Sequence, residues 1–409
     1  MRQPMASSSD RVATVFDADN HYWETSDAFT RYRSPKFADR GVLVKEVDGR
    51  MRYVIRGELH PWIPGPGDVN PRPRPGALHD YFAGTSDSID AALMAEDPKE
   101  HPEWFNREAR LEIMDEQGVE AVWMFPSQGV CMEGPMQPDV EANLDIFHAF
   151  NRWIDDEWGF AHKDRIFAAP YLTLSDLDSA LGELEWVLER GARLVALRPG
   201  PVFTPDGWKS PADPAFDPFW SRVDEAQLVV ATHPGFDDGY RDVENALAQS
   251  WGYESRRRQG PVSSLNFYEP FVDAVMHDRL IHDFMVAVVA HGLFDRHPGL
   301  RFASIENGAA WVPDVLAALR RFHRLSRRAL RGHPVEQFRQ HVWVAPAVSE
   351  AVPALLEHMP VERVLFGSDW PHAEGLADPK QYLEHLVMLS SDEQRKIMRD
   401  NARALTFGL

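Results

Sequence analysis

Two side chains that can bind metal ions follow the first apolar segment of the chain. Residues Val15 to His21 read VFDADNH, so a β-branched and aromatic start runs directly into Asp19 and His21. Such a start predicts a buried strand, and residues two apart on a strand point to the same side. The Asp19 carboxylate and the His21 imidazole can therefore meet one ion, although an acidic, solvated turn is the simpler interpretation of this segment taken alone.

Three later segments place similar side chains after predicted strands. His233 lies in ATHPG, Glu306 in SIENG and Asp369 in FGSDWPH. If these strands are parallel, their carboxyl ends lie at one edge of the sheet. Together with Asp19 and His21, the side chains of His233 and Asp369 suit a divalent transition metal such as zinc, manganese or iron. A core histidine is the alternative for His233, and a helix N-cap is the alternative for Asp369.

The elements that must position these side chains alternate between strands and helices. The predicted strands are the segment from Val15, Val119–Phe125, Ile166–Leu174, Arg193–Arg198, Leu228–Thr232, Leu300–Ile305, His341–Val344 and Arg363–Phe366. The predicted helices are Asn106–Gln117, Val140–Phe160, Leu177–Glu189, Pro218–Ala226, Phe271–Ala290, Val312–Ala329, Val352–His358 and Asp392–Leu405. Repeated β-α units predict a parallel sheet. Eight of them predict an α/β fold, a TIM-like (β/α)8 barrel with its site at the carboxyl ends of the strands.

Residues 40–103 read as an insertion into this barrel. Val42 to Ile55 holds two β-rich runs around Asp-Gly, which is typical of a hairpin. Gly57 to Gly76 is dense in proline and glycine and predicts a long irregular loop. We expect this loop over the carboxyl ends of the strands or at a subunit contact. The domain prediction is a disordered lead-in at 1–13 and one barrel domain at 14–409.

The composition makes several classes of partner unfavourable. The chain of 409 residues has a formal net charge of -20, which disfavours binding to nucleic acid and to anionic membranes. No apolar stretch approaches the roughly 20 residues that span a bilayer, and the N-terminus lacks the apolar segment of a secretory signal. The single cysteine, Cys131, excludes an intrachain disulfide. We therefore expect a cytoplasmic protein that acts on a small molecule, without nucleic-acid or membrane partners.

As a set, the motifs resemble the amidohydrolase superfamily, in particular the branch of the aminocarboxymuconate-semialdehyde and resorcylate decarboxylases. The resemblance rests on DADNH, THPG, HGLFDRHPGLRFASIENGAAWVP, FGSDWPH and DNARAL, and the insertion falls outside it. It implies a barrel with one divalent ion bound by Asp19, His21, His233 and Asp369. Asp19 stands where most members have the first histidine of a His-x-His motif, and some members, the resorcylate type among them, also carry an acidic residue there.

Two positions bear on the reaction and on the number of ions that the resemblance implies. The well-known decarboxylases have a proton-handling histidine after the sixth strand, where this chain has Glu306. A carboxylate there can act as a general acid or base, bind the metal, or be structural. The fourth strand supplies Arg198 where binuclear members use a carboxylated lysine, so the resemblance implies one ion. Arg198 is a candidate for binding an anionic substrate group, with a structural salt bridge as the alternative.

We predict a metal-dependent hydrolase that uses metal-activated water on an amide, ester, lactone or thioester. Asp369 is the expected proton acceptor, Glu306 assists it, and Trp23 and His372 join Arg198 as candidates for substrate contact. The alternatives are a non-oxidative decarboxylase of an aromatic or dienoic acid and a non-catalytic ligand-binding barrel. The expected cofactor is one divalent ion, zinc first and manganese or iron as alternatives. The expected assembly is a homodimer or a higher homo-oligomer.

Overall fold

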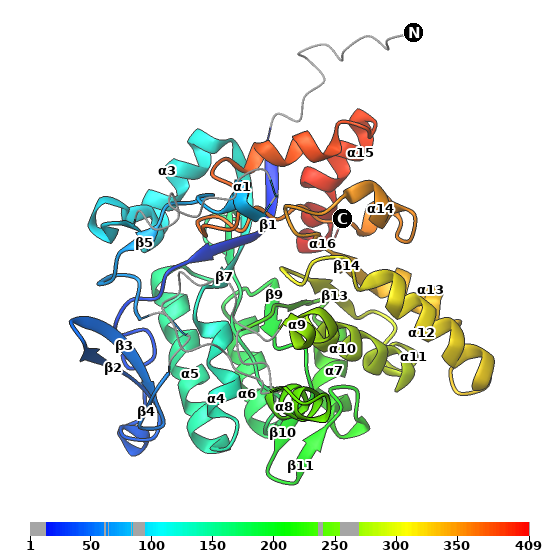
Figure 1. Ribbon diagram of the computed structural model, residues 1–409, viewed down its shortest axis with the longest axis horizontal. Coiled ribbons are helices and arrows are strands. Elements are labelled where there is room, and N and C mark those ends of the chain that lie inside the picture. The colour runs from blue at the N-terminus through cyan, green and yellow to red at the C-terminus, as the bar shows by residue number, and fades with distance from the viewer. Residues whose placement is uncertain are drawn as a thin grey trace.

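Parallel strands alternate with helices along the chain (Figure 1). The computed structural model describes residues 14–60, 63, 65–82, 84, 95–235, 240–253 and 270–408, and the predicted lead-in at 1–13 lies outside them. The parallel strands are β1 (Val15–Tyr22), β7 (Val119–Pro126), β8 (Ile166–Ala168), β9 (Leu194–Leu197), β12 (Val229–Thr232), β13 (Arg301–Ser304) and β14 (Val342–Val344). The longer helices are α3 (Arg107–Gln117), α5 (Val140–Glu157), α6 (Leu177–Leu188), α7 (Asp217–Glu225), α8 (Arg241–Ser250), α10 (Arg279–Ala290), α12 (Val312–Leu325) and α13 (Pro334–His341). The shorter helices are α1 (His79–Phe82), α4 (Glu133–Met136), α9 (Pro270–Met276), α11 (Leu293–Arg296), α14 (Val352–Leu356), α15 (Ser391–Arg395) and α16 (Asn401–Phe407).

The parallel strands form two sheets, β1-β7-β8 and β9-β12-β13-β14. A single parallel bridge between Tyr171 and Ala196 links the segment after β8 to β9. The strand residues are mostly buried and, apart from the polar residues of β1, mostly apolar, as parallel strands covered by helices require. The predicted α/β class with parallel strands is therefore confirmed. Among the described residues, each helix is too short or too polar to cross a membrane.

The predicted eighth strand is reduced to single backbone contacts. A 3-10 turn, η6 (Val361–Arg363), occupies the start of the predicted segment. The Leu365 N–H then donates to the Val344 carbonyl at 2.9 Å, and the Ala18 N–H donates to the Phe366 carbonyl at 2.8 Å. Residues 364–366 thus lie between β14 and β1, where the eighth strand was expected. The prediction of a regular strand at Arg363–Phe366 is wrong because the turn takes up its first residue.

Two predicted helices are interrupted. The helix predicted at Phe271–Ala290 is two helices, α9 and α10, that break around Asp278, the N-cap of α10. Aspartate is less favourable than alanine or leucine in a helix interior, although the Asp278 side chain makes no capping hydrogen bond here. The last predicted helix is α15, a π-helical turn at Lys396–Asp400 and α16. The Lys396–Asp400 turn and α16 pack beside β1 (Figure 1). The C-terminal segment therefore contacts the first strand of the fold.

The insertion begins with an antiparallel hairpin of β2 (Val42–Val47) and β3 (Arg50–Ile55), followed by β4 (Glu58–Leu59). This small sheet lies at the left edge of Figure 1. The rest of the insertion includes the short strands β5 (Arg72–Pro73) and β6 (Ala95–Glu96). Its Gly67 N–H donates to the Glu24 carbonyl at 2.9 Å, and its Gly76 N–H donates to the His372 carbonyl at 3.0 Å. The proline-rich segment therefore contacts residues that follow the carboxyl ends of β1 and of the 364–366 segment.

Candidate functional site

Four of the candidate side chains meet beyond the ends of β1, β12 and β13. The Asp19 Oδ1 atom lies 3.2 Å from His21 Nε2, and the two imidazoles approach through their Nε2 atoms at 3.4 Å between His21 and His233. His233 Nε2 lies 2.8 Å from Glu306 Oε2. One potential ligand atom from each of these four residues lies within 4.8 Å of the other three. Side chains that the sequence analysis places at the ends of different strands thus lie close together.

Asp369 belongs to a second group that overlaps the first. Its Oδ1 atom lies 3.4 Å from His21 Nε2 and 2.6 Å from His372 Nδ1. Among the described residues, this second group contains His21, Glu306, Asp369 and His372. The predicted ligand set of Asp19, His21, His233 and Asp369 is thus divided between two groups, and Glu306 occurs in both.

Burial and backbone conformation set the orientation of these side chains. Asp19, His21, His233 and Asp369 are buried, whereas the Glu306 side chain is 32% exposed. Glu306 has a φ of 56° and Asp369 a φ of 57°, a left-handed conformation that residues other than glycine adopt at a cost. Both residues follow directly on strand-like segments. The turn that ends each segment therefore aims a carboxylate into the site.

The electrostatics of the group fit a divalent cation. Burial and the neighbouring carboxylates, Glu306 first among them, hold the pKa of Asp369 well above its usual range. Burial opposes a charge on His21, but hydrogen bonds to Asp19 and Glu306 outweigh it and raise the pKa of His21 to about 10. The buried Asp19 Oδ1 lies 3.2 Å from His21 Nε2. A dense set of carboxylates with two facing imidazole nitrogens is the donor set that such an ion requires.

Asp17 supports the turn that precedes Asp369, a role that the sequence pattern alone does not indicate. Its carboxylate accepts hydrogen bonds from the Ser368 N–H at 2.9 Å and from the Ser368 hydroxyl at 2.6 Å. Burial, partly offset by these bonds, raises the pKa of Asp17 to about 6. Because Ser368 precedes Asp369, this contact fixes the start of the turn that carries Asp369.

Arg110 supports the end of β1 from helix α3. The buried guanidinium donates to the His21 carbonyl at 2.8 Å and to the Asn20 side chain, and it stacks 4.3 Å from the centre of the Trp370 ring. The sequence marks Arg110 as an ordinary helical residue. Its role follows from its contacts with His21 and Asn20, which lie 89 and 90 residues away along the chain.

His372 is held at both ring nitrogens. Its Nδ1 faces Asp369, and its Nε2 lies 2.7 Å from the Ser127 hydroxyl. That hydroxyl donates to the Tyr22 carbonyl at 2.7 Å, so it accepts from the Nε2–H of His372. Ser127 follows β7 and carried no motif that singled it out.

The other two substrate-contact candidates have different surroundings. The Trp23 ring lies 5.1 Å from the His372 ring and carries the Arg72 guanidinium 4.2 Å from its centre. Arg198 is buried, and its Nε lies 3.7 Å from Glu133 Oε2. The structure thus contains an ion pair at Arg198, as the salt-bridge alternative expected, while Trp23 lies directly beside the site.

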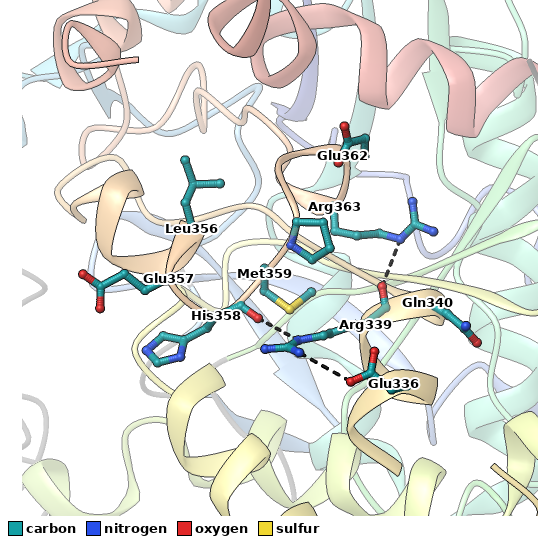
Figure 2. A pocket seen from close by; sticks show the side chains of 10 residues that line it. Glu336, Arg339, Gln340, Leu356, Glu357, His358, Met359, Glu362 and Arg363 are labelled. Atoms are coloured by element: carbon teal, nitrogen blue, oxygen red, sulfur yellow. Dashed lines mark hydrogen bonds and ion pairs between the residues drawn. The ribbon is translucent and has the colours of Figure 1, made fainter. Parts of the chain in front are cut away.

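A cavity of about 630 Å³, drawn in Figure 2, is lined by none of these side chains. Its lining comes from α13, α14 and the turn that follows, and includes Glu336, Arg339, His358 and Arg363. These residues precede β14 and the 364–366 segment, so the cavity lies toward the amino ends of the strands. The Arg339 Nε–H donates to the His358 carbonyl at 2.9 Å. The cavity therefore does not mark the candidate site.

Comparisons with known proteins agree with the geometry. A family model described as Amidohydrolase matches residues 16–407. The gamma-resorcylate decarboxylase of Rhodococcus jostii is 25% identical over 322 residues, which cover 73% of this chain and 87% of that protein. The crystal structure of the amidohydrolase map2389c from Mycobacterium avium subsp. paratuberculosis is 39% identical, with a TM-score of 0.88 and coverage of 96% of this chain and 97% of that one.

A more distant structure has the same fold with a metal ion present. The 5-carboxyvanillate decarboxylase of Novosphingobium aromaticivorans, solved with manganese and 4-hydroxy-3-methoxy-5-nitrobenzoic acid, is 14% identical to this chain. The TM-score is 0.58, and the match covers 99% of each chain. At this identity the similarity establishes the fold.

Proposed function

We propose, on the premise that this chain belongs to the amidohydrolase family, that it is a metal-dependent decarboxylase of hydroxylated aromatic carboxylic acids. The observation that carries the proposal is the convergence of Asp19, His21, His233 and Glu306 on one buried point. The gamma-resorcylate decarboxylase that matches over most of both chains supports decarboxylation rather than hydrolysis. The decarboxylase alternative of the sequence interpretation is thus better supported than its first choice.

The residues of the chain have separate tasks in this reaction. Asp19, His21 and His233 would hold the ion, which when bound supplies an electrophilic centre for the carboxylate of the substrate and an adjacent oxygen. Burial of these side chains keeps bulk water from the reacting bond. As the bond between the ring carbon and the carboxylate breaks, carbon dioxide leaves and the ring carbon keeps the electron pair. That carbon takes one proton, which Asp369 Oδ1 is placed to hold against His372 Nδ1.

Hydrolysis remains the second candidate because of one residue. Glu306 supplies a carboxylate at the position where the resemblance to the decarboxylases implies an imidazole. A carboxylate beside a cation accepts protons more readily than it donates them, which suits the activation of water.

The two reactions release different products, so one experiment separates them. Protein loaded with Mn²⁺ or Zn²⁺ is incubated with gamma-resorcylate and 5-carboxyvanillate, and in parallel with phenyl esters and lactones. We expect carbon dioxide from at least one aromatic acid and no release of acid from the esters. Acid release from the esters without carbon dioxide from any aromatic acid would support hydrolysis instead.

Metal dependence is tested with His233→Ala. Because this change removes one imidazole ligand, we expect the metal content of the purified protein to fall by about tenfold or more. His358→Ala is the matched control, since His358 lies at the distant cavity shown in Figure 2. Full metal occupancy in His233→Ala would remove His233 from the ligand set.

A further inference from the structure

The segment that joins α12 to α13 carries a concentration of positive charge. Between residues 320 and 331 the chain has six arginines and no acidic residue, although the formal net charge of the whole chain is -20. All six side chains are exposed. We call this segment the arginine edge, and its arginines are Arg320, Arg321, Arg324, Arg327, Arg328 and Arg331.

Ion pairing distinguishes the arginine edge from the arginines on either side of it. Arg296 Nε lies 2.9 Å from Asp217 Oδ1, and Arg339 Nη1 lies 3.5 Å from Glu336 Oε1. Among the described residues, none of the six arginines of the edge has such a carboxylate partner. Neighbouring like charges repel each other, so an anion from outside the chain would lower the energy of this surface.

The fold places these charges on one side of α12 and on the turn that follows it. The buried Leu316 and Leu319 hold one face of α12 against the core. Arg321 and Arg324 therefore lie on the outer face of the helix. The turn at residues 326–333 continues this outer surface at the right-hand edge of Figure 1.

One apolar side chain is exposed in the middle of the arginine edge. Leu325, at the end of α12, is 80% exposed, and Arg324 and Arg327 flank it in the sequence. A leucine side chain gains roughly tenfold or more in affinity when it moves from water into an apolar environment. A partner of this surface therefore fits better if it offers apolar contact beside its negative charges.

Contacts with the rest of the fold hold the backbone of the turn in place. The Asp295 carboxylate accepts the Arg331 N–H at 2.7 Å and the Gly332 N–H at 3.3 Å. The centres of the His323 and His333 rings lie 4.4 Å apart, so the end of α12 also contacts the start of α13. Binding at this surface therefore does not require the backbone to become ordered first, which would weaken it.

Anionic lipid fits these features better than nucleic acid does. A bilayer presents phosphate groups, which guanidinium groups bind with two hydrogen bonds, and beneath them an apolar layer that accepts a leucine. Nucleic acid also offers phosphates, but its unstacked bases bind to aromatic side chains, whereas the arginine edge exposes a leucine. Charges more than about 8 Å away are screened at physiological ionic strength, so the net charge of -20 does not prevent a local contact at one edge.

We propose that the arginine edge docks the protein on an anionic lipid bilayer, with its guanidinium groups at the phosphates and Leu325 in the layer beneath them. The proposal departs from the expectation that the chain has no membrane partner, because that expectation averages the charge over the whole surface. It concerns contact with the bilayer surface and does not involve a membrane-spanning helix. It is independent of the reaction that the site catalyses.

The test is co-sedimentation of the full chain with vesicles of phosphatidylcholine alone or with about 30% phosphatidylglycerol, at about 0.1 M salt. Because each basic residue near an anionic surface strengthens binding roughly fivefold, we expect the wild type to bind the anionic vesicles at least about tenfold more tightly. Reversal of two charges in Arg327→Glu/Arg328→Glu should lower this affinity by about tenfold or more. Leu325→Ala should lower it by roughly threefold to tenfold.

Lys45→Glu/Arg50→Glu is the matched control, since it reverses the same number of charges elsewhere. Both residues are exposed on the β2–β3 hairpin, at the opposite edge of Figure 1. This variant should keep the wild-type affinity within about threefold, because its changes lie beyond the screening length from the docked edge. Arg327→Lys/Arg328→Lys keeps the charge and should retain binding, and it provides the result if charge reversal unfolds the protein. Circular dichroism shows whether each variant is folded.

Three results would overturn the proposal. One is wild-type binding that is no stronger to anionic than to neutral vesicles, and another is an equal loss of binding in the two charge-reversal variants. The third is unchanged vesicle binding in Leu325→Ala. Tighter binding of the wild type to single-stranded DNA than to anionic vesicles would then assign the arginine edge to nucleic acid instead.

Discussion

At the scale of single residues, the contacts of His372 show how the site is organised beyond its metal-binding atoms. The Ser127 hydroxyl accepts from one ring nitrogen and donates to the Tyr22 carbonyl, so Nδ1 of His372 is left to face Asp369. This arrangement makes Ser127 a positioning residue. It acts on Asp369 through the orientation of the imidazole.

Ser127→Ala removes that orientation without touching a proposed ligand. We expect kcat to fall about tenfold, the lower end of the effect of outer contacts at metal sites, with metal content unchanged. Steady-state kinetics and metal analysis of the same preparation check this. Ser127→Thr keeps the hydroxyl and should retain most of the activity. Equal losses in both variants would show that Ser127 acts through packing alone.

The sequence revealed some of these residues and not others, for a physical reason. Asp19 and His21 were predictable because strand alternation and position at a strand end are local properties. Asp17 was not, because its role depends on Ser368, which lies 351 residues away along the chain. The role of Ser127 likewise depends on a contact with His372 across 245 residues.

At the scale of elements, the 364–366 segment ends against β1 at a position that only glycine fits. A Cβ atom added to Gly367 would lie 2.4 Å from the Asp19 Cβ. This separation is too short for two carbon atoms, so either β1 or the segment has to move. The close approach explains how a segment with only single bridges still places Asp369 beside His21.

Gly367→Ala should therefore damage both the fold and the site. We expect a loss of about 1–3 kcal/mol in the free energy of unfolding, typical of overpacking, together with weaker Mn²⁺ binding because Asp19 is displaced. Denaturant unfolding and metal titration measure the two effects.

Gly182→Ala is the control for this change. Gly182 lies in α6, and an added Cβ would meet nothing within 4 Å. We expect this variant to be more stable by up to about 1 kcal/mol, because alanine favours the helix. Unchanged metal affinity and stability in Gly367→Ala would show that the segment is not held as tightly as the structure indicates.

Hydrophobic patterning predicted a strand or helix well where a single continuous segment with one apolar pattern forms one buried element. It did not predict the 3-10 turn at Val361–Arg363 or the break before α10, since neither changes the apolar pattern. It also did not predict α8 or α13. Their polar faces read as loop in the absence of the partners against which they pack.

At the scale of the whole molecule, Glu24 joins the insertion to the parallel strands and their helices. Its buried carboxylate accepts the Gln128 N–H at 2.9 Å and the Gly129 N–H at 2.7 Å, and its carbonyl accepts the Gly67 N–H at 2.9 Å. Burial, partly offset by these bonds, raises the pKa of Glu24 from 4.5 to about 7. The junction between the insertion and the rest of the fold therefore contains a carboxyl group that stays protonated in the folded state at mildly acidic pH.

This pKa predicts a direction for the dependence of stability on pH. Between about pH 4.5 and 7, the unfolded chain has lost the Glu24 proton and the folded chain has kept it. The contribution of Glu24 to stability is therefore greatest below pH 4.5 and falls as the pH rises to 7, by on the order of 3 kcal/mol. Glu24→Gln cannot ionise, so its free energy of unfolding should fall less over this range than that of the wild type. Parallel curves for the two proteins would contradict the raised pKa.

Membership of the amidohydrolase family indicates metal-dependent chemistry. Whether the reaction is hydrolysis or decarboxylation cannot be read from the composition. A negative net charge and an α/β pattern suit hydrolases and decarboxylases equally. The homodimer and the cytoplasmic location stay predictions.

The central claim is that the side chains at the strand ends hold an ion that supports loss of a carboxylate from an aromatic ring. Its most direct test follows gamma-resorcylate labelled with ¹³C in the carboxyl group by ¹³C nuclear magnetic resonance in D₂O. With Mn²⁺-loaded protein, the account predicts transfer of the label to carbon dioxide and bicarbonate, with one deuterium on the ring carbon that carried it. Chelator should abolish both signals. The contrary result is a label that stays in the carboxyl group of both gamma-resorcylate and 5-carboxyvanillate when the protein is shown to contain metal.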